Sequence, residues 1–245
     1  MDVADFYCGS LGGVDPIFEL GSLPFLARTT QASWQLVSEA RHAYEAAFDG
    51  LGVRLLYVSP WPPTGLWTTV PVRTLTDLGG LRIRCYDRMS AEVFGAAGAQ
   101  AVSLPFGQAL CEARQGQLQG VLSSGDAEAG RRLCGCMAFF YDLRYAAPIS
   151  FVVVNRQAYL QLSDAGQRFV DQAARRTEAE LWANIGERIE RNRGRTLAAG
   201  VAWSGTMAGC VEEALRQEAA TLIKRWAGRS GGVASQIHRR DVAGS

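Results

Sequence analysis

The sequence predicts an α/β fold of two lobes, joined by crossing segments and by one long helix. Strand-like and helix-like patterns alternate along the chain, which is typical of an α/β sheet of mainly parallel strands. Residues 60–65 are rich in proline, which lacks the N–H that a central strand needs, so they form a loop or a crossing between lobes. A helical pattern capped by Ser163 or Asp164 runs to Arg193, roughly 45 Å at 1.5 Å per residue, and so exceeds one small domain.

The individual elements follow from the spacing of apolar residues and from the glycines and prolines that interrupt it. In the first half of the chain they are a helix over 34–48, strands over 55–58 and 81–86, a helix over 89–97, a strand over 101–104, a helix over 105–115 and a strand over 120–123. In the second half they are apolar segments over 139–146 and 149–155, the long helix, a strand over 201–203 and a final helix over 211–226.

Composition and charge narrow the class of protein. The chain has 245 residues, of which 48% are hydrophobic and 20% charged, as in ordinary globular proteins. Its net charge of +1 provides no basic field for nucleic acid or for an anionic membrane, so we expect neither as a partner. The first five residues lack a basic segment followed by an apolar one, so no signal peptide is predicted, and this feature alone indicates the cytosol.

Neither a metal site nor a nucleotide cofactor is expected. The Gly-rich segments fit neither the dinucleotide-binding pattern nor the Walker sequence. Six cysteines are too few for a disulfide scaffold, and the spacing Cys134-Gly-Cys136 is not that of a zinc or redox pair. We interpret the cysteines as small buried apolar residues. They are Cys8, Cys85, Cys111, Cys134, Cys136 and Cys210.

Catalysis by a nucleophile is disfavoured, because the chain offers little that could act as its base. The two histidines, His42 and His238, lie in an amphipathic helix and in the C-terminal tail, where we expect surface positions. A small α/β hydrolase or transferase that uses Cys85 or Ser123 therefore remains only a disfavoured alternative. We expect the protein not to be an enzyme.

Two features are candidates for ligand binding. Arg84 ends an apolar strand, and its guanidinium offers a rigid fork for a carboxylate. The other interpretation, which the pattern alone favours, is a solvated strand face shared with Arg82 at a period of two. The loop 123–126 follows a strand and precedes a helix, where ligands bind in open α/β sheets, although Ser124 or Asp126 could equally cap that helix.

Several segments together resemble one protein family. Asp77–Arg84, which reads DLGGLRIR, resembles the signature "DLkGLKiR" of the DctP-type solute-binding subunits of tripartite ATP-independent periplasmic (TRAP) transporters. The order and spacing of further motifs agree over about residues 3 to 227. These motifs lie at 15–18, 23–26, 57–67, 98–106, 113–120, 149–155 and 163. The stretch 119–124 departs from the family pattern, which leaves the identity of the ligand open.

The resemblance implies a periplasmic receptor with a type II periplasmic-binding-protein-like fold. It would capture a small organic acid between two lobes and deliver it to the membrane permease subunits. The first lobe would comprise 1–60 and 149–190, and the second 61–148 and 191–245. The chain begins where relatives are already inside the first lobe, so we expect that lobe to lack its first strand and helix. A truncated, non-transporting remnant or a sensory ligand-binding module is the alternative.

The resemblance also assigns roles to single residues. The arginine that ends the signature strand pairs with the ligand carboxylate, and this role falls on Arg84. Phe106 matches an aromatic residue that packs on the ligand. The other implied positions are polar contacts at Asp87, Ser123 and Thr64, an acidic position of the opposite lobe at Asp5, and cleft residues at Trp61 and Tyr145.

Overall fold

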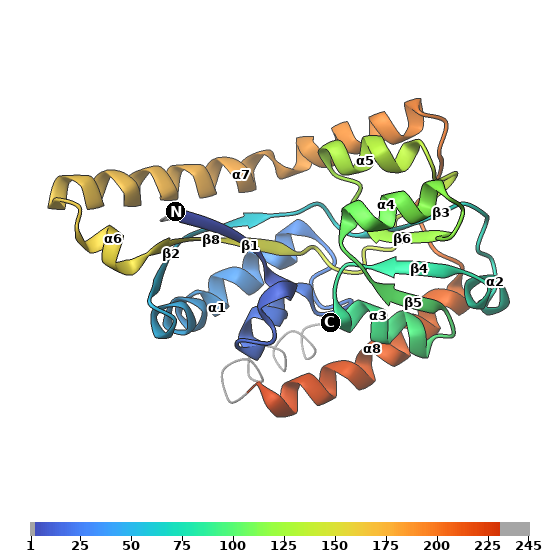
Figure 1. The fold of residues 1–245 in the computed structure, drawn as a ribbon, viewed down its shortest axis with the longest axis horizontal. Helices are drawn as coiled ribbons and strands as arrows, with labels where there is room; N and C mark the ends of the chain where they lie inside the picture. The colour runs from blue at the N-terminus through green and yellow to red at the C-terminus, as the bar shows by residue number, and fades with distance from the viewer. Residues whose placement is uncertain (1–2, 231–245) are drawn as a thin grey trace. The chain divides into compact units, whose positions relative to one another are not determined.

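The computed structural model describes residues 3–230, which form two compact units (Figure 1). Among these residues, unit 1 comprises 3–61, 147–186 and 226–230, and unit 2 comprises 62–146 and 187–225. The sequence led us to expect lobes of 1–60 with 149–190 and of 61–148 with 191–245, a division that assigns the C-terminal helix wholly to the second lobe. In the structure the end of that helix belongs to unit 1.

The elements alternate between strands and helices along the chain. The strands are β1 (Val3–Tyr7), β2 (Val53–Pro60), β3 (Gly65–Thr68), β4 (Arg82–Cys85), β5 (Gln100–Ser103), β6 (Gly120–Ser123), β7 (Phe139–Tyr141), β8 (Ile149–Asn155) and β9 (Ala202–Ser204). The α-helices are α1 (Thr30–Gly50), α2 (Leu75–Gly79), α3 (Arg88–Ala96), α4 (Phe106–Arg114), α5 (Ala127–Cys134), α6 (Arg156–Leu160), α7 (Asp164–Ala198) and α8 (Gly209–Arg229). Two 3-10 segments, η1 (Cys8–Leu11) and η2 (Pro16–Ser22), lie between β1 and α1.

Unit 1 is built on a three-stranded antiparallel sheet with the order β1-β8-β2. β8 lies in the middle, and six of its seven residues are buried, as its largely apolar sequence predicts. Behind it, Phe151 packs edge-on against Tyr44 and Phe48 of α1, with ring centroids 4.7 and 5.2 Å away. Phe18 of η2 completes this aromatic core at 5.6 Å from Phe151.

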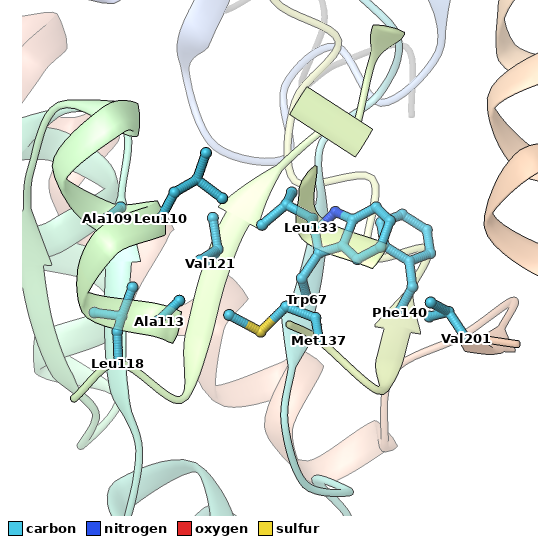
Figure 2. Close-up of a cluster of buried hydrophobic side chains, with 10 residues drawn as sticks. All are labelled: Trp67, Ala109, Leu110, Ala113, Leu118, Val121, Leu133, Met137, Phe140 and Val201. Carbon is cyan, nitrogen blue, oxygen red and sulfur yellow. The ribbon is translucent and has the colours of Figure 1, made fainter. Parts of the chain in front are cut away.

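Unit 2 contains a six-stranded sheet with the order β5-β4-β6-β3-β7-β9. α4 and α5 lie on one face of the sheet, and α3 lies on the other (Figure 1). Figure 2 shows the apolar cluster under α4 and α5, in which the Trp67 indole packs on Phe140 with ring centroids 4.8 Å apart. Val121 of β6 and Leu133 of α5 are fully buried beside them. This cluster fixes β3 and β6 beneath the two helices.

Local hydrogen bonds explain why the short helix α2 forms just before β4. Thr74 and Asp77 form a capping box, in which the Thr74 side chain accepts from the Asp77 N–H and the Asp77 carboxylate accepts from the Thr74 N–H. A hydrogen bond from the Arg73 N–H, together with those to Thr74, holds the pKa of the Asp77 carboxyl below its usual value. Leu78 is fully buried, so the short helix α2 is anchored just before β4 begins.

The long helix α7 extends further than its sequence pattern predicted. It runs from Asp164 to Ala198, about 52 Å at 1.5 Å per residue. Ser163 caps it, as expected, because its hydroxyl accepts a hydrogen bond from the Gly166 N–H at 3.2 Å. Residues 164–186 belong to unit 1 and 187–198 to unit 2, so the helix contributes to both units.

The fold class is confirmed, but the prediction of mainly parallel strands is wrong. Among the described strands, three pairings are parallel (β4 with β5, β4 with β6, and β7 with β9) and four are antiparallel. Two strands were not predicted from the sequence: β1, which pairs antiparallel with β8, and β3, which pairs antiparallel with β6 and β7. Strands of four or five residues carry too little periodicity to be detected.

The interpretation of all six cysteines as buried is also wrong. Cys8 and Cys85 are buried, whereas Cys111 and Cys210 are exposed and the remaining two are partly exposed. The His42 side chain is fully exposed, as predicted, and His238 lies outside the described residues. Within residues 3–230, each helix is too short or too polar to cross a membrane.

The close approach of β3 and β7 at Gly65 generates a stability prediction. A Cβ at this position would lie 2.2 Å from Phe140 Cζ and 2.5 Å from the Tyr141 carbonyl oxygen, which is backbone and cannot rotate away. Gly65→Ala should therefore lower the free energy of unfolding by about 1–3 kcal/mol, measured by urea denaturation with circular dichroism. The matched control is Gly50→Ala, because a Cβ there meets no atom within 4 Å. Gly65→Ala with wild-type stability would contradict this packing.

Candidate functional site

Arg84 is fixed at the carboxyl end of β4, which lies between β5 and β6 in a parallel arrangement. Its Nε donates to the Leu104 carbonyl at 2.9 Å, and its Nη1 donates to the Leu122 carbonyl at 3.3 Å. Only 8% of the residue is exposed. The guanidinium is thus held between the ends of the two neighbouring strands, at the edge where open α/β sheets bind ligands.

Arg82 occupies the same face of β4 but has a different environment. Its guanidinium pairs with Glu112 of α4, and its side chain remains about one-third exposed. The interpretation in which both arginines share a solvated face therefore holds for neither. Arg82 ties the strand to α4, whereas Arg84 lies buried at the strand end.

Phe106 lies beside the Arg84 guanidinium. It is the first residue of α4, and its ring centroid is 5.7 Å from Arg84 Cζ, within the range of a cation–π contact. The residue is partly buried and packs against the apolar cluster of unit 2. The ring therefore offers an apolar surface next to a fixed positive charge.

Ser123 ends β6 at the same edge of the sheet. Its hydroxyl accepts a hydrogen bond from the Gly125 N–H at 3.1 Å, and its carbonyl accepts one from Trp67 Nε1 at 3.2 Å. The residue is partly exposed. Its main chain is thus fixed on the Trp67 side, next to the Leu122 carbonyl that holds Arg84.

Asp87 has a structural role that the sequence did not reveal. It is the N-cap of α3, and its carboxylate accepts from the Ser90 N–H at 2.7 Å and from the Ser90 hydroxyl at 2.6 Å. Removal of the carboxyl from water raises its pKa, an effect that the Ser90 hydrogen bonds and the nearby Arg84 charge oppose. Asp87 is therefore both a helix cap and a charge within electrostatic reach of Arg84.

Thr64 and Tyr145 are buried where two passages of the chain pair. The Thr64 N–H donates to the Ala146 carbonyl at 2.8 Å, and the Tyr145 N–H donates to the Thr64 carbonyl at 2.9 Å. Thr64 is 2% exposed and Tyr145 is fully buried, with its ring packed near those of Phe94 and Tyr86. In this structure both residues shape the frame of unit 2.

Trp61 and Asp5 belong to unit 1. Trp61 Nε1 donates to the Ser150 hydroxyl at 2.9 Å, which fixes the indole against the start of β8. Asp5 is exposed on β1 and lies opposite Val152, as does Tyr57 from the other side. Burial raises the pKa of Tyr57, and the charge of Asp5 adds to this effect.

The structure thus brings four of the predicted residues, Arg84, Phe106, Ser123 and Asp87, to the carboxyl edge of β5, β4 and β6. Sequence reasoning missed the two carbonyl oxygens that orient the guanidinium, those of Leu104 and Leu122. Backbone groups carry no side-chain signal, and only the strand order places them. The resulting arrangement is a buried, oriented cation with an aromatic wall, which is suited to binding a carboxylate.

The family comparison covers nearly the whole chain. Residues 1–227 match the model of the family described as bacterial extracellular solute-binding protein, family 7. Among solved structures, the chain is similar to the extracytoplasmic solute receptor DctP7 of Bordetella pertussis, which binds pyroglutamic acid. That match has a TM-score of 0.91 and 25% identity, and covers 98% of this chain and 80% of the receptor.

Two more distant structures share the fold. One is a TRAP periplasmic solute-binding protein from Desulfovibrio salexigens with bound orotic acid, with a TM-score of 0.85 and 18% identity over 99% of this chain and 80% of that one. The other is a TRAP periplasmic solute-binding protein from Chromohalobacter salexigens with bound D-glucuronate. That match has a TM-score of 0.87 and 17% identity, and covers 98% of this chain and 80% of the other. Both match the two-lobe α/β fold class predicted from the sequence.

The environment of Asp87 predicts how stability changes with pH. Because its pKa is raised on folding, the wild type loses stability relative to Asp87→Asn as the pH rises from about 4 through the folded-state pKa. Asparagine also caps helices well, so Asp87→Asn should keep α3 intact, whereas Asp87→Ala should cost about 1 kcal/mol. Thermal unfolding of the three proteins from pH 4 to 7 measures both effects. A constant difference between wild type and Asp87→Asn would show that the carboxyl is solvated.

Proposed function

Because the chain belongs to family 7 of the bacterial extracellular solute-binding proteins, we propose that it binds a small organic carboxylate through Arg84. The family is extracytoplasmic, and we propose that this protein acts in the periplasm and delivers its ligand to the permease subunits of a TRAP transporter. The carboxylate would pair with the guanidinium at the carboxyl edge of β4.

The observation that carries this proposal is the fixed, buried guanidinium. An arginine that is 8% exposed and held by two backbone carbonyls has already lost most of its side-chain freedom before a ligand arrives. A carboxylate that binds to it therefore loses less free energy in ordering the site. The planar fork also favours a carboxylate over a single-point anion.

The relatives suggest the chemical class of the ligand. Pyroglutamic acid, orotic acid and D-glucuronate, the ligands of the three receptors described above, each carry a carboxyl group on a ring. In this chain, Phe106 provides an apolar face 5.7 Å from the Arg84 Cζ, where such a ring would pack. We therefore propose a small cyclic carboxylic acid.

Binding without conversion fits the chemistry of the residues near Arg84. Cys85 follows it directly, but burial raises the pKa of this thiol far above neutrality, so it remains protonated and unreactive. The Ser123 hydroxyl accepts a hydrogen bond from a backbone N–H, not a bond that would activate it as a nucleophile. These features support a receptor over the hydrolase alternative.

Substitution of Arg84 tests the proposal. Arg84→Ala should weaken binding by about 3–5 kcal/mol, the cost of removing one partner of a buried ion pair. Arg84→Lys should restore little of this, because an ammonium lacks the planar fork. Calorimetric titration with pyroglutamate, orotate and D-glucuronate measures the affinities, after a thermal-shift screen has identified which acids stabilise the wild type.

Arg82→Ala is the matched control, since Arg82 lies on the same strand but pairs with Glu112. It should leave the affinity nearly unchanged. The proposal would be wrong if Arg84→Ala, folded by circular dichroism, bound the same acid as tightly as the wild type.

A further inference from the structure

Three side chains of α7 converge on the loop that follows β6. Arg188, Asn192 and Arg195 are spaced at i, i+4 and i+7, so they share one face of the helix. All three contact residues 125–126. Because Ser123 lies two residues before Gly125, α7 is linked to the loop next to a proposed ligand contact.

Asp126 is the centre of this contact. Its side chain is only 3% exposed. Arg188 Nε lies 3.0 Å from both carboxylate oxygens, and Arg188 Nη2 makes a further bond to Oδ2. Asn192 Nδ2 donates to Oδ1 at 2.7 Å. Although burial alone would raise the pKa of Asp126, these hydrogen bonds hold it below its usual value.

Arg195 extends the contact to the backbone of the loop. Its Nη2 donates to the Gly125 carbonyl at 2.8 Å and to Asn192 Oδ1 at 2.9 Å. Asn192 is itself 7% exposed, and its carbonyl accepts from the Thr196 hydroxyl. The network therefore joins two consecutive loop residues to two turns of one helix.

Trp67 holds the loop from the opposite side. A Cβ on Gly125 would lie 2.2 Å from Trp67 Cζ2, and Gly125 has a φ of +63°, which favours glycine. Ala127 also has a positive φ, 43°, which is unfavourable for a residue with a side chain. Such a conformation persists where the surroundings over-determine it. Here Trp67 and α7 enclose the loop between them.

The chemistry of the network indicates that it fixes the geometry of the loop and adds little to the stability of the fold. A buried ion pair is weak evidence for stability, because the desolvation of both charges offsets much of their attraction. It does, however, fix one geometry, since the Arg188 fork matches the carboxylate in a single orientation. The two residues before this loop are Leu122, whose carbonyl holds Arg84 at 3.3 Å, and Ser123.

We propose that Asp126, Arg188, Asn192 and Arg195 form a clamp that positions Ser123 for ligand binding. The clamp residues are positioning residues, because they act through the loop and not on the ligand. This inference rests on the proposed function, since it assigns the clamp to the carboxylate site. The specificity of that site then depends on a helix face as well as on the sheet edge.

A double-mutant cycle in ligand affinity tests the clamp. Asp126→Asn should weaken binding of pyroglutamate, or of whichever of orotate and D-glucuronate the wild type binds, by about tenfold. In a Ser123→Ala background the same substitution should cause less than about a twofold further loss, because its effect passes through that residue. Arg188→Lys keeps the charge but loses the planar fork, so its ligand affinity should lie between those of the wild type and Asp126→Asn.

The Trp67 indole provides a readout that needs no ligand. Its Nε1–H resonance in a ¹H–¹⁵N spectrum, assigned with Trp67→Phe, should shift in Asp126→Asn because the Ser123 carbonyl it bonds to moves. The control is Glu128→Gln on α5, an exposed acid two residues away that pairs with Arg131 and Arg132. It should leave both the resonance and the affinity unchanged.

The outcomes separate the two proposals. If the wild type binds none of the three acids, the proposed function fails, and the assignment of the clamp to a carboxylate site fails with it. If the wild type binds but Asp126→Asn leaves both affinity and the Trp67 resonance unchanged, only the clamp is overturned. The clamp would likewise be overturned if Asp126→Asn caused the same loss of affinity in the wild type and in the Ser123→Ala background.

Discussion

The site depends on one interaction, the hydrogen bonding of the Arg84 guanidinium to the carbonyls that end two flanking strands. A charged group enclosed by protein requires polar partners, and the backbone oxygens of Leu104 and Leu122 accept two hydrogen bonds from the guanidinium. The guanidinium is thus oriented before a ligand arrives, and this orientation is the physical basis on which we propose carboxylate binding. Strand order, more than any neighbouring side chain, creates this arrangement.

The surrounding elements each maintain that strand order. The capping box at Thr74 and Asp77 sets where β4 begins, and the Asp87 cap sets where the chain turns into α3. The Trp67–Phe140 contact holds β3 against β7 in the cluster beneath α4 and α5 (Figure 2). β6 pairs with both β3 and β4, so a disturbance at Trp67 reaches the strand that carries Leu122. The orientation of the Arg84 guanidinium therefore depends on the packing of unit 2.

How much of this the sequence could predict differs from residue to residue. The helix that contains Tyr44 and Phe48, the largely apolar β8 and the Ser163 cap followed from periodicity and capping, because these signals are local. β1 and β3 did not, since their partners lie far away in the chain and their own sequences are short. Pattern alone favoured a solvated face for Arg84, whereas the resemblance to a family gave it the role of pairing with a ligand carboxylate. Asp126 illustrates the remaining gap: its partners on α7 are more than 60 residues away, and only the tertiary structure pairs them.

The central position of β8 in unit 1 has a consequence for biosynthesis. β1 and β2 pair only with β8 among the described strands, and Val3 lies opposite Val154. The first 60 residues therefore emerge from the ribosome well before the strand that completes their sheet. At 5–20 residues per second, this interval lasts about 5–20 s. Until residue 155 is made, β1 and β2 lack the strand with which each of them pairs, so the sheet of unit 1 cannot form.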